Sequence, residues 1–69
     1  MNYPQIIKEE RLKRSLSQSD FAEKMGVSPT LISLIESGKR GASDKLKVKI
    51  ANYFNLSVEY IFFNQKDYK

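Results

Sequence analysis

Helix-start residues recur along this chain at intervals too short for any long helix. Ser17, Ser28 and Ser43 each precede a segment with apolar residues at helical spacing, and Pro29 directly follows the second of these serines. A serine side chain accepts a hydrogen bond from an amide in the first helical turn, and proline is tolerated at the first position because its missing N–H has no partner there. Ser57 marks a fourth start of the same kind. The chain is therefore predicted to fold into several short helices.

Helical periodicity between these signals predicts five short helices and an all-α fold. We expect them at about residues 4–14, 18–25, 29–37, 44–55 and 58–62. No segment alternates apolar and polar residues over a useful length, so no strand is predicted. A single domain is expected at 1–63, followed by a polar C-terminal tail at 64–69.

The apolar residues of these segments recur at spacings that bring them to one helix face, and they define the predicted core. They are Ile6, Ile7, Leu12, Phe21, Ala22, Met25, Leu31, Ile32, Ile35, Leu46, Ile50, Ala51 and Phe54. Gly26 follows the second helix, where a left-handed cap is easiest for glycine. Ser17 and Asp20 have the spacing of a capping box, in which each side chain accepts a backbone amide of the other residue.

The composition excludes most catalytic chemistry. The 69 residues include no Cys, no His and no Trp. The chain therefore forms no disulfide and offers a metal no thiolate or imidazole ligand. It also has no cysteine nucleophile and no histidine base. The close carboxylate pairs, Glu9 with Glu10 and Asp20 with Glu23, have no nucleophile predicted beside them. We predict a protein that is not an enzyme and that uses no metal and no cofactor.

Hydropathy gives no sign of a membrane segment. The longest uninterrupted apolar run is Tyr60 to Phe63, far shorter than the roughly 20 residues that span a bilayer. The start of the chain has no apolar secretory segment behind a basic stretch. We expect an intracellular, cytoplasmic protein with no membrane partner.

The positive charge is concentrated in one stretch. The chain has 12 Lys plus Arg against 8 Asp plus Glu, a net charge of +4. Residues 39–49 hold five cations and one anion, so this stretch alone carries +4 and the other charges cancel. Lys45 and Lys49 share a face of the fourth helix, whereas Lys47 lies on another. Charge alone leaves two interpretations open, a solvated lysine face and a patch that binds a polyanion.

Residues 18–37 carry the most informative pattern, two helices of about eight residues joined by a very short turn. Ala22 is small where the two helices meet, and Gly26 turns the chain. The wedge between the helices is filled by Met25, Val27, Ile32 and Ile35. Helices joined in this way cross steeply, which leaves the outer face of the second helix free. The major groove of B-DNA is wide enough to accept one such helix.

The sequence around this pattern resembles the lambda-repressor-like, Cro/CI-type (XRE) family of helix-turn-helix DNA-binding domains. The likeness runs from about residue 7 to residue 62 and is carried by Arg11, Leu16-Ser17-Gln18, Phe21-Ala22, Gly26-Val27-Ser28, Ile32-Ser33, Ile35-Glu36-Ser37-Gly38-Lys39 and Leu56-Ser57-Val58. The resemblance implies a helix-turn-helix formed by the second and third of five helices. It also implies a transcriptional repressor or regulator that binds operator half-sites on double-stranded DNA as a homodimer.

The same resemblance assigns roles to residues of this sequence, with the third helix as the recognition helix in the major groove. Residues expected to contact DNA are Gln18, Ser28, Pro29, Thr30, Ser33, Leu34, Lys39 and Arg40. Arg11 and Glu36 match a partly buried ion pair that is structural and does not touch DNA. The base-reading positions hold Pro29, Thr30 and Leu34 in place of amides or arginines. We therefore expect weak direct readout and a larger share of phosphate and shape recognition.

Aromatic residues gather at the end of the fifth helix. Phe62 and Phe63 are candidates for a dimerisation surface, with simple core packing as the other interpretation. An alternative function follows from such a surface: a protein-interaction module, antitoxin-like or the partner of a sensor protein, that keeps the helix-turn-helix shape. The basic stretch at 39–49 favours DNA binding, because a pure interaction module does not need it.

Overall fold

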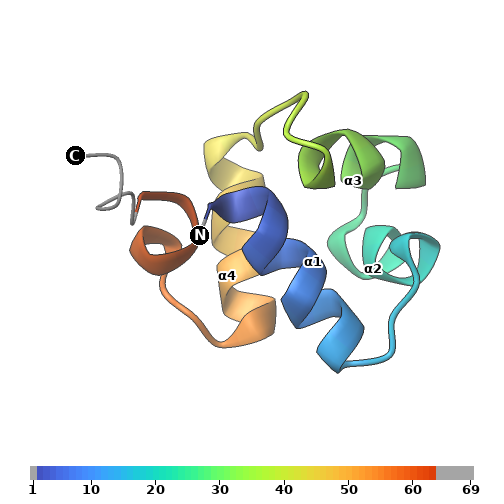
Figure 1. Ribbon diagram of the computed structural model, residues 1–69, viewed down its shortest axis with the longest axis horizontal. Coiled ribbons are helices and arrows are strands. Elements are labelled where there is room, and N and C mark those ends of the chain that lie inside the picture. The colour runs from blue at the N-terminus through green and yellow to red at the C-terminus, as the bar shows by residue number, and fades with distance from the viewer. Residues whose placement is uncertain (1, 64–69) are drawn as a thin grey trace.

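The computed structural model describes residues 2–63, and this part of the chain is built of helices without any strand (Figure 1). The helices are α1 (Tyr3–Lys13), α2 (Gln18–Met25), α3 (Pro29–Glu36) and α4 (Asp44–Phe54), followed by a π-helical turn, η1 (Glu59–Phe63). The predicted all-α fold of five short helices is confirmed, with each boundary within one residue of its expected place. The expected tail at 64–69 lies outside the described residues.

Serine side chains fix the starts of α2, α3 and α4. Ser17 Oγ accepts the Asp20 amide at 3.0 Å and the Asp20 carboxylate accepts the Ser17 amide at 3.2 Å, which confirms the capping box. Ser28 and Ser43 each accept an amide of the first turn of α3 and α4 at 3.2 Å. Gly26 ends α2 in the left-handed conformation with φ +72°, which costs glycine no steric penalty. These local contacts set both ends of α2 and the starts of α3 and α4.

Side chains from the four α-helices and η1 form one core. Its buried apolar residues are Ile6, Ile7, Phe21, Ala22, Met25, Ile32, Ile35, Leu46, Ile50, Ala51, Phe54, Ile61 and Phe62. Phe21 of α2 stacks on Phe54 of α4 with ring centroids 5.2 Å apart. The core residues predicted on α2, α3 and α4 are buried, apart from Leu31, which is half-buried.

One core prediction on α1 is wrong. Leu12 is 54% exposed, and the neighbouring Arg11 is buried instead. Ile7 and Arg11 are four residues apart and share the inward face of α1, while Leu12 lies about 100° further around the helix. The error arises because an apolar periodicity does not anticipate an arginine at a position that faces the core.

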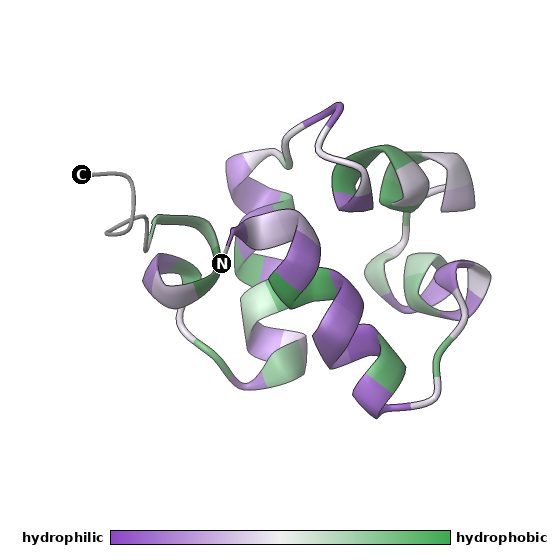
Figure 2. Ribbon diagram, in the orientation of Figure 1, coloured by the Kyte–Doolittle hydropathy of each residue, from purple (hydrophilic) through white to green (hydrophobic). Residues whose placement is uncertain are grey.

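The helices of the candidate motif lie at one end of the domain and η1 lies at the other, with α1 and α4 between them (Figure 1). The segment that joins α3 to α4 runs along the upper edge of this view. η1 packs against α1, and the rings of Phe62 and Tyr3 have centroids 5.8 Å apart. In Figure 2 α3 has green, hydrophobic parts between paler ones and a purple end, and its buried residues are Ile32 and Ile35.

Candidate nucleic-acid interface

α2 and α3 form a helix-turn-helix. Residues 26–28 alone separate the two helices, and the Val27 amide donates to Ala22 O at 3.0 Å. Ala22 is fully buried, and α2 packs directly against α3. The inward face of α3, with Ile32 and Ile35, is used for this packing. The opposite face of α3 therefore points outward.

The outward face of α3 presents small polar and apolar groups. Pro29, Thr30 and Ser33 are exposed, and Leu34 is half-buried. The hydroxyls of Thr30 and Ser33 can donate to or accept from base edges and phosphates, and a proline or leucine can contact a thymine methyl group. Ser28 Oγ is occupied as an acceptor by the Leu31 amide at 3.2 Å, so its O–H is the part left to donate.

Two cations follow α3 on a loop that is anchored at both sides. Lys39 and Arg40 are exposed, and neither forms an ion pair within residues 2–63. Their amides both donate to Leu34 O, at 3.0 and 3.3 Å, which folds the loop back on the end of α3. Tyr3 Oη of α1 donates to Arg40 O at 3.3 Å, and Gly38 supplies the turn with φ +78°. The loop is thus held near α3, and within residues 2–63 neither charge has an acidic partner.

The three lysines of α4 have different surroundings. Lys49 Nζ donates to Met25 O at 2.8 Å and ties α4 to the end of α2. Lys47 Nζ lies 4.9 Å from the ring centroid of Phe63, within the range of a cation–π interaction. Lys45 and Lys49 line the same surface hollow of about 230 Å³, as their spacing predicts. Part of the basic stretch is therefore used in packing, and its outward charges are mainly those of the loop and of Lys45.

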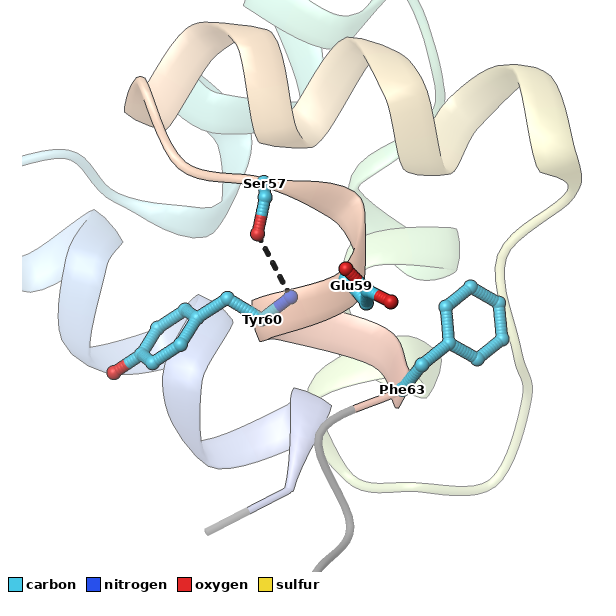
Figure 3. A pocket seen from close by; sticks show the side chains of 4 residues that line it. All are labelled: Ser57, Glu59, Tyr60 and Phe63. Carbon is cyan, nitrogen blue, oxygen red and sulfur yellow. Dashed lines mark hydrogen bonds between the residues drawn. The ribbon is translucent and has the colours of Figure 1, made fainter.

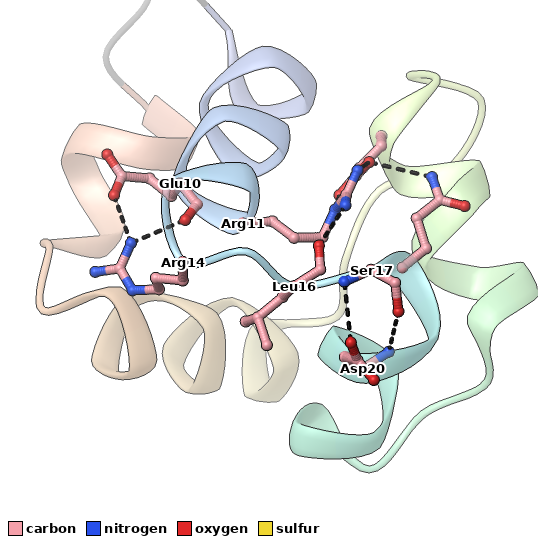
Figure 4. A network of polar contacts seen from close by, with 8 residues as sticks. Glu10, Arg11, Arg14, Leu16, Ser17 and Asp20 are labelled. Carbon is pink, nitrogen blue, oxygen red and sulfur yellow. Dashed lines mark hydrogen bonds and ion pairs between the residues drawn. The ribbon is translucent and has the colours of Figure 1, made fainter.

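A buried ion pair joins α1, the start of α2 and the end of α3. Arg11 Nε and Nη2 donate to the two carboxylate oxygens of Glu36 at 2.7 and 2.9 Å, and Nη1 donates to Leu16 O at 2.7 Å (Figure 4). The Arg11 and Glu36 side chains are only 7% and 4% exposed. The hydrogen bond with Glu36 raises the pKa of the Arg11 guanidinium, so Arg11 remains charged. Glu36 Oε1 also accepts from Gln18 Nε2 at 3.2 Å.

An exposed cluster on α1 ties this helix to the end of α4. Arg14 Nη1 donates to Glu10 Oε1 at 2.9 Å, and Lys13 Nζ donates to Glu10 Oε2 at 3.1 Å. Arg14 also lies 4.9 Å from the ring centroid of Phe54 and donates to its carbonyl oxygen at 3.3 Å. The hydrogen bond from Arg14 lowers the pKa of the Glu10 carboxyl. This cluster supports the packing of α1, and none of its residues is among those expected to contact DNA.

The η1 end of the domain carries an open groove of about 370 Å³, lined by Ser57, Glu59, Tyr60 and Phe63. Figure 3 shows the rings of Tyr60 and Phe63 pointing away from each other on two sides of the turn. These side chains are 46% and 59% exposed, whereas Phe62 is 7% exposed and belongs to the core. The burial of Phe62 agrees with the core-packing interpretation for this residue, because its ring lies on the inward side of η1. Phe63 is outward, and its part in dimerisation stays a prediction.

The described part of the chain offers no metal centre: residues 2–63 contain no group of three or more His, Cys, Asp or Glu that could hold an ion. None of the helices in this range is both long and apolar enough to cross a membrane. Every buried side-chain nitrogen or oxygen in the same range has a hydrogen-bond partner.

Sequence reasoning missed contacts that join distant segments. The Tyr3–Arg40 bond spans 37 positions, and no local pattern marks it. Gln18 and Glu36 were each identified, but for separate roles, and the bond between them was not anticipated. Tyr60 belongs to the aromatic run that was noted, yet periodicity over so short a helix does not tell which of its rings face outward.

These features define a helix-turn-helix protein, and comparison with known proteins agrees. A family model described as Helix-turn-helix matches residues 7–61. The chain belongs to this family of Cro/CI-type, DNA-binding helix-turn-helix transcriptional regulators, and the lambda-repressor-like fold expected from the sequence is confirmed.

Similar proteins carry the same description. An uncharacterised HTH-type transcriptional regulator of Methanocaldococcus jannaschii is 44% identical over 57 residues, which are 83% of this chain and 86% of the relative. One from Archaeoglobus fulgidus is 43% identical over 56 residues, 81% of this chain and 79% of the relative. Among solved structures, SinR in the SinR protein/SinI protein complex matches with a TM-score of 0.81 and 26% identity. That match covers 97% of this chain and 66% of the SinR chain.

Proposed function

We propose that the chain represses transcription by sequence-specific binding to double-stranded DNA, as a homodimer with one α3 in the major groove of each operator half-site. The observation that carries the proposal is the surface formed by α3 and the loop after it. Thr30 and Ser33 are exposed on the helix, and Lys39 and Arg40 follow it without an ion pair in the described chain. An exposed helix face flanked by available cations suits a major groove and the phosphates that border it.

The helix and the loop make different contributions in this proposal. Lys39 and Arg40 neutralise phosphates and release counterions, which supplies affinity without regard to sequence. The hydroxyls of Thr30 and Ser33 supply direct readout, but they form fewer bidentate hydrogen bonds to bases than amides or arginines do. DNA shape therefore carries a large share of the specificity. Repression then requires only that the bound dimer occupies a promoter.

Dimerisation through η1 completes the proposal. Tyr60 and Phe63 expose apolar rings there, and α3 lies at the other end of the domain (Figure 1). Two copies joined at η1 leave both recognition helices free. A two-fold symmetric dimer of this class binds half-sites about one helical turn, roughly 34 Å, apart.

Selection from a randomised duplex library, followed by fluorescence anisotropy, tests the proposal. We expect enrichment of a two-fold symmetric sequence. The affinity of the protein for it should fall with salt, and log K should drop by about 0.9 per tenfold rise in salt concentration for each phosphate neutralised. Lys39→Ala or Arg40→Ala should weaken binding to all duplexes alike and reduce the salt slope by about 1. Thr30→Ala or Ser33→Ala should instead relax the preference at particular base pairs.

Lys13→Ala is the matched control, because Lys13 is a 67% exposed cation on α1 that is not assigned to the interface. Its removal should leave the preference and the salt slope nearly unchanged. If Thr30→Ala and Ser33→Ala weaken binding to all duplexes alike, as Lys39→Ala and Arg40→Ala do, α3 is excluded as the reading helix. Failure to enrich any duplex, with no salt dependence, would contradict DNA binding itself.

The alternative is a protein-interaction module, and the exposed rings of Tyr60 and Phe63 are the observation that favours it. SinR, which this chain resembles in fold, is found in a complex with SinI protein. In this alternative the η1 groove holds a protein partner and the basic loop is not needed. Substitution of Lys39 and Arg40 together would then leave the function unchanged, whereas Phe63→Ser would abolish it.

A further inference from the structure

The Glu36 carboxylate has a contact that a purely structural ion pair does not require. Besides the two hydrogen bonds from Arg11, its Oε1 accepts a hydrogen bond from Gln18 Nε2 at 3.2 Å. Gln18 is the first residue of α2 and is half-buried, whereas the Glu36 side chain is only 4% exposed. A residue assigned to DNA contact is thus bonded to a carboxylate that itself lies out of reach of DNA.

We infer that Glu36 is a positioning residue for DNA binding: it orients the Gln18 carboxamide so that the second N–H of Nε2 faces the DNA as a donor. The inference rests on the proposed DNA-binding function and deepens it. It assigns the Arg11–Glu36 pair a part in recognition, exerted through Gln18 and not by contact with DNA.

The chemistry of the two groups explains why Glu36 selects one orientation. A glutamine carboxamide has an oxygen end that accepts and a nitrogen end that donates two hydrogen bonds, and the two ends are nearly equal in size. An ionised carboxylate only accepts, so only the nitrogen end of Gln18 can face it. One N–H is then used by Glu36, and the other N–H and the oxygen point elsewhere. Phosphate oxygens also only accept, and the remaining N–H matches them.

Arg11 holds this carboxylate in place. Its bidentate contact holds both oxygens of Glu36, and its third nitrogen holds Leu16 O at 2.7 Å. Leu16 lies two positions before Gln18, so one guanidinium fixes both the carboxylate and the backbone that leads into α2. A buried ion pair is often no more stabilising than apolar residues of similar volume. An orienting role gives these charges a use that apolar residues would not provide.

A double-mutant cycle on DNA affinity separates this role from a structural one. The variants are Gln18→Ala, the paired exchange of Arg11→Met with Glu36→Leu, and the triple combination. Affinity is measured by anisotropy with a fluorescein-labelled duplex selected from a randomised library by the wild-type protein. Glu10→Gln with Lys13→Gln is the control, because it removes an ion pair of the same helix without changing the net charge.

We expect Gln18→Ala to lower affinity roughly 3- to 10-fold, the range for one hydrogen bond. The paired exchange should lower affinity by a similar factor, and the triple variant should be no weaker than either, because each change removes the same contact. The control should bind like the wild type. Wild-type affinity in either the paired exchange or Gln18→Ala would overturn the positioning role. So would a loss of affinity in the triple variant equal to the product of the two separate losses.

Folding of each variant is checked by circular dichroism. If the paired exchange does not fold, NMR of the ¹⁵N-labelled wild-type protein decides: one Gln18 side-chain proton should exchange with solvent more slowly than those of Asn52, whose side chain is exposed and makes no hydrogen bond within residues 2–63. Equal exchange would overturn the inference. Absence of wild-type binding to every duplex contradicts the proposed function instead, so the two failures are distinguishable.

Discussion

Replacement of the buried Arg11 by alanine should destabilise the domain more than replacement of any exposed residue of α1. Arg11 is buried, and it makes three hydrogen bonds of 2.7 to 2.9 Å. Arg11→Ala removes all three and leaves the Glu36 carboxylate, 4% exposed, without a counter-charge. Breaking a buried ion pair on one side costs about 3–5 kcal/mol.

That cost is large relative to the total stability of such a small domain. At roughly 0.05–0.15 kcal/mol per residue, a chain of 69 residues is stable by about 3–10 kcal/mol. A domain of this size loses about 4–8 °C in melting temperature for each kcal/mol. Arg11→Ala should therefore melt at least about 12 °C below the wild type, or fail to fold at 37 °C.

Thermal unfolding followed by circular dichroism at 222 nm measures this effect. Exchange of both partners, Arg11→Met with Glu36→Leu, should recover most of the lost stability, because no charge is left buried. Lys13→Ala, which removes a 67% exposed partner of Glu10, should shift the melting temperature by only a few degrees. A melting temperature of Arg11→Ala within about 3 °C of the wild type would refute the assignment of this pair as a buried link between α1 and α3.

Three further substitutions test local features of the fold. Ser17→Ala removes the capping box of α2 and should lower stability by about 1–2 kcal/mol, measured by urea unfolding; an unchanged midpoint would contradict the cap. Gly26→Ala forces a side chain into φ +72° and should cost about 1–2 kcal/mol in the same assay, since the nearest atom to the new Cβ is the movable Lys49 Nζ at 3.3 Å and backbone strain dominates. Glu10→Gln tests pH dependence: because Arg14 lowers the pKa of Glu10 in the folded state, its stabilisation is present above the unfolded pKa near 4.5 and is lost as pH falls through the lower folded pKa. The free energy of unfolding of the wild type should exceed that of this variant by ~0.5 kcal/mol at pH 7 and equal it near pH 2. A difference that grows in acid would contradict the predicted direction of the pKa effect.

The starts of α2, α3 and α4 were predictable because each follows a local signal. Ser17, Ser28 and Ser43 cap the helices that follow them, and Gly26 ends α2 in the left-handed conformation. Such signals depend only on residues a few positions apart, so they can be recognised from the sequence alone. The outward positions of α3, such as Thr30, follow equally from its apolar period.

The errors concern side chains whose place depends on tertiary contacts. Leu12 was expected inside, but Arg11 occupies the buried position on α1. Surface and core placements were both open for Phe62 and Phe63, and the structure buries Phe62 and exposes Phe63. In both cases the competitor is the adjacent residue, and only packing against the rest of the domain selects between them. The link from Gln18 to Glu36 has the same origin, since the partners are 18 positions apart.

Titration of the ¹⁵N-labelled protein with the selected duplex, followed by amide chemical shifts, tests the central claim most directly. The DNA-binding account predicts the largest shifts at Gln18, along residues 28–34 of the α3 segment and at Lys39 and Arg40. It predicts only small changes along the outer face of α1. Shifts confined to the η1 groove around Phe63, with the α3 segment unchanged, would contradict the account.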